Sequence, residues 1–172
     1  DNGYDISDYE SIAPCYGSME EFETLLKEAH ARDVKVVIDL VVNHSSNEHP
    51  WFLNALEGRE ASKREYYIWR DAAPGGGPPN NWGALFGGPA WTRDEKSGQY
   101  YLNLFSSRQP DLNWENPALR EQIYKMMRRW LDRGVDGFRM DVISLIAKGD
   151  DFSDGPAGKS GYHDPRARIA AN

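Results

Sequence analysis

Cysteine is almost absent from this sequence. Cys15 is the only cysteine among 172 residues, so an intrachain disulfide is impossible and a zinc site built on cysteine thiolates is excluded. A chain with a single thiol is typical of a reducing compartment. We therefore expect a cytoplasmic protein.

Long apolar runs and basic clusters are missing as well. No stretch approaches the roughly 20 consecutive apolar residues that a membrane-spanning helix needs. Acidic residues outnumber basic residues by 27 to 20, and the lysines and arginines are scattered along the chain. Without a positive surface, neither nucleic acid nor an anionic membrane is an expected partner.

The chain also lacks the usual beginning of a protein. It has no initiating methionine and no charged-then-apolar leader, and residues 1–9 read as a polar and aromatic loop. We expect an internal segment of a longer protein. Its composition, 40% hydrophobic and 27% charged, is that of a folded globular domain, so a packed core is expected.

Two helix-then-strand units are predicted. Ser18 and Glu21 have the spacing of a capping box, which predicts a helix over residues 19–31, and the nearly continuous apolar run 34–42 then predicts a strand covered on both faces. Two such units in one chain predict an α/β protein with a parallel sheet and helices outside it.

The second unit begins at Asn116, an N-cap followed by Pro117, and its helix ends at Gly134. Its strand is expected over residues 135–142. About seventy residues separate the two units, far more than an ordinary connection, so they must hold structure of their own. Within them and beyond, we expect short strands at 66–69 and 100–105, a glycine-rich loop at 74–79 and a polar loop over 149–172.

Charged residues occur where the second strand ends. Arg139 and Asp141 are two positions apart on a strand, so their side chains leave the same face. The carboxyl ends of parallel strands are where α/β barrels build their active sites. Spacing alone leaves two readings open: a functional pair, or an ion pair that only fixes packing.

His44 follows the first strand at the corresponding edge of the sheet. His44 and His49 alone do not supply the three or four ligands that a zinc ion needs. Taken by itself, His44 is either a functional residue or a neutral, hydrogen-bonded loop histidine.

Four motifs resemble signature sequences of the α-amylase superfamily, glycoside hydrolase family 13. They occur in the family's order and span nearly the whole chain. In chain order they are 1–9 (DNGYDISDY), 39–44 (DLVVNH), 109–113 (QPDLN) and 137–141 (GFRMD). The first is similar to the segment after the second barrel strand in the oligo-1,6-glucosidase branch, and the third to the short motif of the inserted domain B.

The resemblance implies a (β/α)8 barrel, or TIM barrel, of which this chain holds the third and fourth strands. Domain B would be inserted after the third strand. Residues 1–43 would then belong to the catalytic barrel, residues 44–113 to domain B, and residues 114–172 to the barrel again.

The resemblance also implies roles for individual residues. Asp141 takes the position of the catalytic nucleophile, and Arg139 the position that orients it and keeps it ionised. Four residues match substrate-binding positions. These are Asp1 and His44, which hydrogen-bond the glucose beside the scissile bond, Tyr4, the aromatic platform under the ring, and Phe86, a pocket wall from domain B.

These residues suit a retaining mechanism, in which one carboxylate attacks the anomeric carbon while a protonated carboxyl about 5 to 5.5 Å away protonates the leaving oxygen. The family's acid glutamate and its transition-state His-Asp pair follow later strands and have no counterpart in these 172 residues. We expect a gluco-oligosaccharide substrate, no cofactor, no metal ligands in this segment and a monomeric parent enzyme.

Val142, directly after Asp141, is associated within the resembling branch with α-1,6 linkages. The resemblance therefore favours an oligo-1,6-glucosidase or dextran glucosidase, with α-1,4-linked gluco-oligosaccharides as alternative substrates, and the fragment alone would be inactive. Trehalose-6-phosphate hydrolase and sucrose isomerase share much of the pattern. From another class, a non-catalytic relative such as the heavy chain of an amino-acid transporter would be expected to lose the nucleophile and carry a membrane span.

Overall fold

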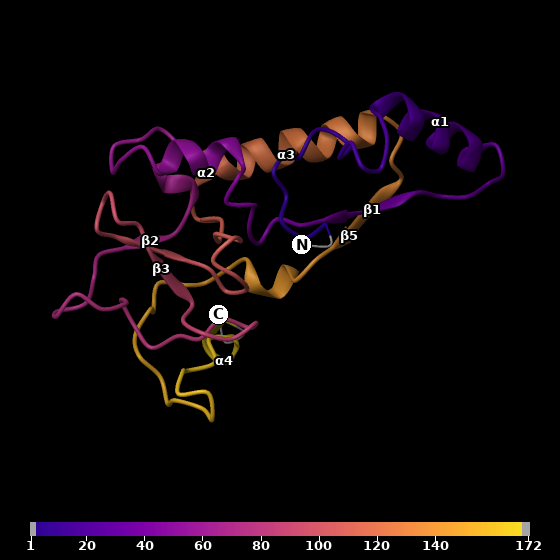
Figure 1. The fold of residues 1–172 in the computed structure, drawn as a ribbon. Coiled ribbons are helices and arrows are strands. Elements are labelled where there is room, and N and C mark those ends of the chain that lie inside the picture. The colour runs from indigo at the N-terminus through magenta and orange to yellow at the C-terminus, as the bar shows by residue number, and fades with distance from the viewer. Residues whose placement is uncertain (1–2, 170–172) are drawn as a thin grey trace.

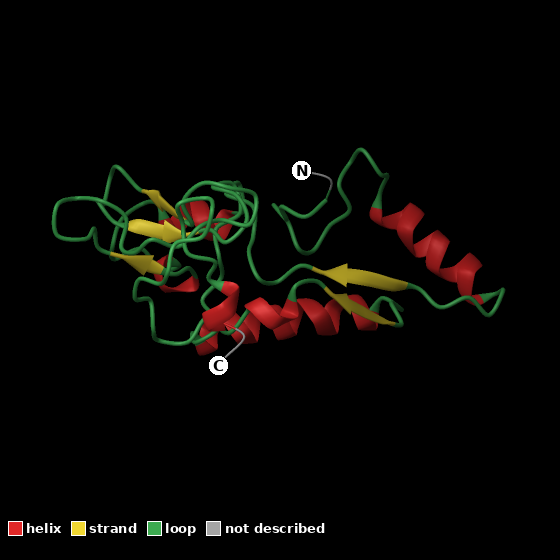
Figure 2. Ribbon diagram, turned by 90° about the horizontal axis from the view of Figure 1, so that it is seen from below, coloured by secondary structure: helices red, strands yellow, loops and turns green. Residues whose placement is uncertain are grey.

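The structure, a computed structural model, describes residues 3–169 and has mixed α/β content. Its helices are α1 (Met19–His30), α2 (Pro50–Ala55), α3 (Pro117–Asp132) and α4 (Arg166–Ile169), with 3-10 turns η1 (Arg64–Tyr66) and η2 (Ile143–Leu145). Its strands are β1 (Val37–Leu40), β2 (Trp69–Arg70), β3 (Trp91–Arg93), β4 (Tyr100–Leu102) and β5 (Gly137–Met140). The arrangement is elongated, with the β1–β5 pair toward one end and the other strands toward the opposite end (Figures 1 and 2).

The predicted capping box at the start of α1 is confirmed. Ser18 Oγ accepts from the backbone N–H of Glu21 at 3.2 Å, and Glu21 Oε2 accepts from the backbone N–H of Ser18 at 2.8 Å. The apolar face of the helix packs inward: Leu26 is buried, and the ring of Phe22 meets that of Trp130 in α3 edge to face, 5.5 Å between centroids. This contact joins the two long helices.

The caps of α3 are also as predicted. Asn116 accepts from the first-turn backbone N–H groups, with Pro117 at the first helical position. At the other end Gly134 has φ +105°, and the N–H of Val135 donates to the carbonyl of Trp130 at 3.1 Å. This is a Schellman motif, in which a left-handed glycine satisfies the last carbonyls of the helix. It turns the chain directly into β5.

β1 and β5 pair in parallel, with Asp39 opposite Arg139. Both strands are shorter than predicted, because their outer residues lack a partner strand in the described part of the chain. The covering of both faces is also incomplete there, since Val37 is 55% and Met140 50% exposed. The predicted parallel pairing of two helix-then-strand units is nevertheless present.

The long insertion holds its own structure, as expected. It contains α2, η1 and an antiparallel sheet in the order β2-β4-β3. The strand predicted at 66–69 was largely wrong: η1 ends at Tyr66, Tyr67 forms only an isolated bridge to Leu112, and the strand β2 begins at Trp69. The strand predicted at 100–105 is confined to β4. α2 and β3 were not predicted at all.

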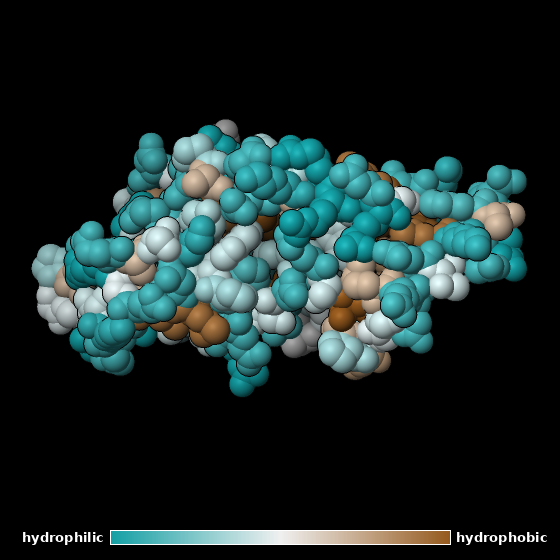
Figure 3. Space-filling model, turned by 90° about the horizontal axis from the view of Figure 1, so that it is seen from above, coloured by the Kyte–Doolittle hydropathy of each residue, from teal (hydrophilic) through white to brown (hydrophobic). Residues whose placement is uncertain are grey.

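Two apolar clusters stabilise the chain. The larger one runs from α1, α3 and β1 to the aromatic rings of the insertion, among them Phe52, Tyr67 and Trp69. The smaller one gathers Trp82, Trp91 and Leu102 with Leu145. Apolar side chains form only separate patches on the largely hydrophilic face drawn in Figure 3. In the described residues, no helix has both the length and the apolar character that crossing a membrane would require.

The tail was predicted as a polar loop, and most of it is. It is nevertheless anchored to the insertion: His163 and Trp82 form a parallel bridge, and the carboxylate of Asp154 accepts from the N–H of Asn81 at 2.8 Å. The short helix α4 at its end was not predicted.

Candidate active site

Arg139 lies between two carboxylates at the ends of β1 and β5. Its Nη1 donates to Asp141 Oδ1 at 2.5 Å and to Asp39 Oδ1 at 3.1 Å. The hydrogen bond to Asp39 is the main reason why the pKa of Arg139 is raised above its usual value. Asp141 is largely shielded, with 13% of its side chain exposed, whereas Arg139 is 57% exposed. Within the described residues, the pair is therefore only partly buried.

Tyr4 is tied to the same edge by both its side chain and its backbone. Its hydroxyl donates to Asp39 Oδ2 at 3.3 Å. Its carbonyl accepts from His44 Nε2 at 2.8 Å and from Gln109 Nε2 at 3.0 Å. A loop that precedes the first helix is thereby held against β1 and the insertion.

His44 is buried, and its hydrogen bonds define its tautomer. Asn43 Nδ2 lies 3.2 Å from His44 Nδ1 and, as an amide N–H, must donate. Nδ1 is then the acceptor, so the proton is on Nε2, which donates to Tyr4. Burial is the main cause of a lowered pKa for His44, and the nearby Asp111 opposes it. The side chain is therefore a neutral imidazole.

A buried lysine orients Asn43. Lys148 Nζ donates to Asn43 Oδ1 at 2.6 Å and to Asp111 Oδ1 at 2.8 Å, and all three side chains are buried. Because an ammonium only donates, Asn43 must present its oxygen to Lys148 and its NH₂ group to His44. Burial lowers the pKa of Lys148, while Asp111 opposes the shift. Within the described residues no group of three or more His, Cys, Asp or Glu could hold a metal ion.

These side chains open on a pocket of about 450 Å³. It is lined by Tyr4, His44, Phe86, Phe105, Gln109, Asp141 and Val142. The volume is within the range of small-molecule sites. The aromatic walls and the single carboxylate suit a ligand with apolar faces and a reactive polar centre.

Phe86 reaches this pocket from a tight turn of the insertion. The turn is closed by hydrogen bonds between Ala84 and Gly88 and between Gly87 and Ala84, and both glycines have positive φ. Phe86 is 73% exposed, and its ring lies 5.6 Å from that of Phe105, edge to face. The aromatic side chain is thus held above the pocket by a turn that requires glycine.

Five of the six predicted site residues lie together: Tyr4, His44, Phe86 and Asp141 line the pocket, and Arg139 contacts Asp141. The sixth, Asp1, falls outside the described residues. Sequence reasoning missed Phe105, Gln109 and Lys148. Gln109 opens one of the four motifs and could have been found there, whereas Phe105 and Lys148 carry no local signal.

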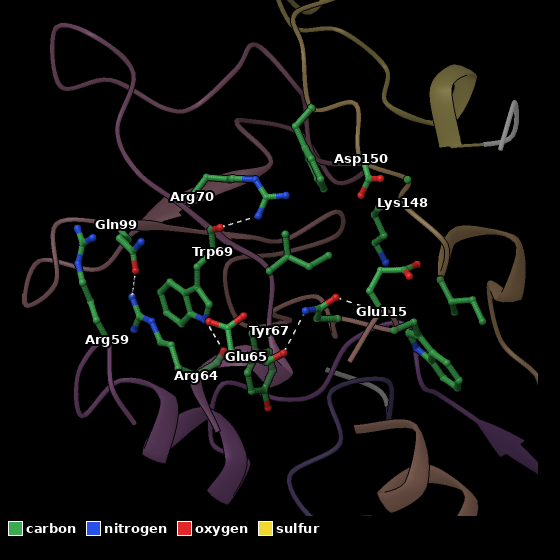
Figure 4. A pocket seen from close by; sticks show the side chains of 16 residues that line it. Arg59, Arg64, Glu65, Tyr67, Trp69, Arg70, Gln99, Glu115, Lys148 and Asp150 are labelled. Carbon is green, nitrogen blue, oxygen red and sulfur yellow. Dashed lines mark hydrogen bonds between the residues drawn. The ribbon is translucent and has the colours of Figure 1, made fainter. Parts of the chain in front are cut away.

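A second hollow of about 430 Å³ lies beside η1 and β2, and Lys148 contributes to its wall (Figure 4). The buried side chain of Arg64 in its wall already has protein partners. Its Nη1 donates to Asp94 at 3.3 Å, and its guanidinium lies 3.3 Å from the centre of the Trp69 ring. Burial lowers the pKa of Arg64, and Asp94 opposes this. The arrangement accounts for how the insertion is held together and indicates no ligand.

Charged groups lie at the carboxyl ends of parallel strands, beside an insertion that supplies aromatic walls. This arrangement defines a class: α/β proteins with their functional residues at one end of the strands. The family can be stated as well. The chain belongs to the alpha-amylase catalytic-domain family, whose model matches residues 1–168.

Curated relatives of known name agree with this assignment. The palatinase of Erwinia rhapontici is 62% identical over 148 residues, which is 86% of this chain and 27% of that protein. The oligo-1,6-glucosidase of Heyndrickxia coagulans is 55% identical over 154 residues, or 90% of this chain and 28% of that protein. The chain thus spans between a quarter and a third of the length of these relatives.

Solved structures of the TIM-barrel enzymes of this family match the fold. The trehalose-6-phosphate hydrolase of Bacillus licheniformis superposes with a TM-score of 0.90 at 53% identity, covering 96% of this chain and 30% of that one. A MutB E254Q mutant in complex with sucrose gives a TM-score of 0.87 at 47% identity, covering 90% of this chain and 28% of that one. Sequence identities of 53% and 47% show that these structures are relatives within the same family, and not only proteins of the same fold.

Proposed function

We propose that the chain is part of a longer retaining α-glucosidase that hydrolyses α-1,6-linked gluco-oligosaccharides, and α-1,4-linked ones as a secondary activity. The observation that carries the proposal is the place of Asp141. Its carboxylate is held by Arg139 at 2.5 Å and forms one wall of a pocket of about 450 Å³. An oriented carboxylate at the base of such a pocket suits attack on an anomeric carbon, with a covalent glucosyl intermediate on Asp141.

The other residues receive roles that follow from their contacts. Arg139 keeps Asp141 oriented and balances its charge. Tyr4 would serve as an aromatic platform for the glucose in the pocket. His44 would form part of the pocket wall, since both of its ring nitrogens already have protein partners. Phe86 covers the glucose ring from the tight turn 84–88 of the insertion. Asp1 is proposed to bind sugar hydroxyls and awaits a direct test.

We assign β1 and β5 to the third and fourth strands of the barrel. Residues 1–43 and 114–172 would then be catalytic barrel, and residues 44–113 domain B. Two observations support this division: the parallel strands each follow a helix, and the antiparallel sheet lies wholly inside the insertion. The carboxyl that protonates the leaving oxygen would come from outside residues 1–172.

In the complete enzyme, Asp141→Asn is expected to preserve the fold and to abolish glucoside hydrolysis. An amide has the shape of the carboxylate but no charge with which to attack or stabilise the oxocarbenium-like centre. Turnover of an aryl α-glucoside and a melting curve are measured side by side. Loss of activity by about 10⁴ or more with an unchanged melting temperature is the expected result.

Activity within about tenfold of the wild type would show that Asp141 is not the nucleophile. A wild-type enzyme that turns over no α-glucoside would instead favour a non-catalytic relative. Asn113→Ala is a suitable control, since its side-chain amide bonds the carbonyl of Glu65, away from the pocket.

Two other substrates have support in the named relatives. One matched structure is a trehalose-6-phosphate hydrolase and another, MutB, was solved with sucrose. We therefore carry a trehalose-6-phosphate hydrolase and a sucrose isomerase as second candidates. Comparing kcat/KM for isomaltose, maltose and trehalose 6-phosphate, with product analysis on sucrose, decides among the three.

A further inference from the structure

Val142, the residue after Asp141, has a left-handed backbone with φ +41° and ψ +35°. In this conformation the β-carbon crowds the following carbonyl oxygen, and a branched side chain makes the crowding worse. Apart from glycines, the only other described residue with positive φ is Asp33, a residue type that tolerates this region. Val142 is thus the strained position of the described chain.

This residue makes the turn that leaves Asp141 at the strand end. The N–H of Asp141 donates to the carbonyl of Leu40 at 3.1 Å, the last bond between the two parallel strands. The N–H of Leu145 then donates to the carbonyl of Val142 at 2.9 Å, which begins η2. The chain thus passes from β5 to η2 across only two residues, Asp141 and Val142. A strained turn of this kind is a known way of exposing a nucleophile at the edge of a sheet.

Contacts on both sides hold the strained conformation in place. Before it, the Asp141–Leu40 bond fixes the end of β5. After it, Lys148 is locked to Asn43 and Asp111 in a buried network. The Val142 side chain itself packs on the smaller apolar cluster. Strain persists only where surroundings fix the backbone so firmly, and such positions concentrate at functional sites.

We propose that Val142 is a positioning residue whose left-handed backbone holds the Asp141 carboxylate between Arg139 and the pocket. The proposal rests on the nucleophile role of Asp141 given above. It assigns to the backbone a role separate from the side chain, which lines the pocket. The two roles predict opposite orders of activity in a pair of variants.

The test compares Val142→Gly with Val142→Ala in the complete enzyme. Both remove the pocket wall, and they differ by one methyl group. If only the wall matters, alanine, the larger side chain, is the better substitute. If the left-handed backbone matters, glycine is better, because alanine stays strained after losing the packing that held it.

We expect Val142→Ala to lower kcat on an aryl α-glucoside by about tenfold with KM within about threefold, since a misplaced carboxylate slows attack without weakening binding. Val142→Gly should recover most of kcat and melt at a higher temperature than Val142→Ala.

Asp33 supplies the matched control, because it shares the positive φ, at +58°, and lies in the connection between α1 and β1, away from the pocket. Asp33→Gly and Asp33→Ala should differ in melting temperature and not in kcat. Equal kcat for the two Val142 variants, or a higher kcat for alanine, overturns the proposal while wild-type hydrolysis leaves the proposed function intact. Absence of wild-type hydrolysis refutes the proposed function itself.

Discussion

His49 is a buried histidine that performs a structural task in its neutral form. Its Nδ1 accepts from the backbone N–H of Trp51 at 3.1 Å and so caps α2, while its ring contacts those of Tyr9 and Trp51. Burial lowers the pKa of His49 from 6.5 to about 4, and the charge of Asp8 only partly opposes this. A protonated ring would have no lone pair left to offer the helix.

This lowered pKa predicts a loss of stability in mild acid. Unfolded His49 takes up a proton near pH 6.5, whereas the folded form does so only near pH 4. Its contribution, up to about 3 kcal/mol, is complete above pH 6.5, declines as the pH falls toward 4 and is absent below it. His49→Asn keeps a capping oxygen and does not titrate. Urea unfolding from pH 7.5 to 4 should show a shallower pH dependence for this variant, and identical slopes would contradict the assignment.

Site residues could be predicted where a charge stands in an apolar pattern. Arg139 and Asp141 interrupt a strand, and the structure brings them into contact. Lys148 could not be found in this way, because it follows the mainly apolar stretch 143–147 outside the predicted strand. It is recognisable only once folding places it beside Asp111 and beside Asn43, which is 105 residues away. Long-range pairing of this kind leaves no local signal.

At the scale of elements, local chemistry decided what was predictable. α1 and α3 were found because their caps involve neighbouring residues, as at Ser18 and Asn116. The strands of the insertion are two or three residues long and are defined by partners, as β2 is by β4. α2 is only six residues long and begins at a histidine cap, an uncommon choice. Among these short elements, only β4 was predicted, as part of the strand expected at 100–105.

Lys148 links the segment after β5 to the insertion, so its loss should loosen the two from each other. Lys148→Met leaves Asp111 charged, buried and without its cation. Removing one partner of a buried pair typically destabilises by about 3–5 kcal/mol. We expect a fall in unfolding free energy of that size.

The double variant Lys148→Met/Asp111→Asn provides the comparison. A neutral amide can still accept from the N–H of Leu104, which donates to Asp111 Oδ2 at 2.7 Å. The double variant should therefore be more stable than Lys148→Met alone. Strictly additive losses in this cycle would mean that the two charges do not interact.

At the scale of the whole molecule, the described residues form two small sheets, one of which is the pair β1–β5. β1 pairs with β5 and with no other strand of residues 3–169. Each strand therefore has one side with free backbone groups, and apolar residues such as Val37 are exposed beside them. Unpaired edges of this kind readily join other chains.

Residues 1–172 expressed alone are expected to be inactive and to self-associate. Inactivity follows from the missing acid, whose contribution is typically about 10² to 10⁴ in rate. Association follows from the open edges of β1 and β5. Light scattering and an isomaltose assay check both points. A monomer with a cooperative melting curve would contradict the argument from topology, and measurable hydrolysis would mean that a carboxyl within the segment, such as Glu115, serves as the acid.

The ammonium of Lys148 belongs to the same chain as the two oxygens that it joins. Its effective concentration beside them is set by the length and stiffness of the connecting backbone, and not by the medium. A dissolved ion in that place would be lost on dilution or to a competing chelator, whereas a tethered one returns in an intramolecular step. The connection between the segment after β5 and the insertion therefore does not depend on a dissolved cation bound at that place.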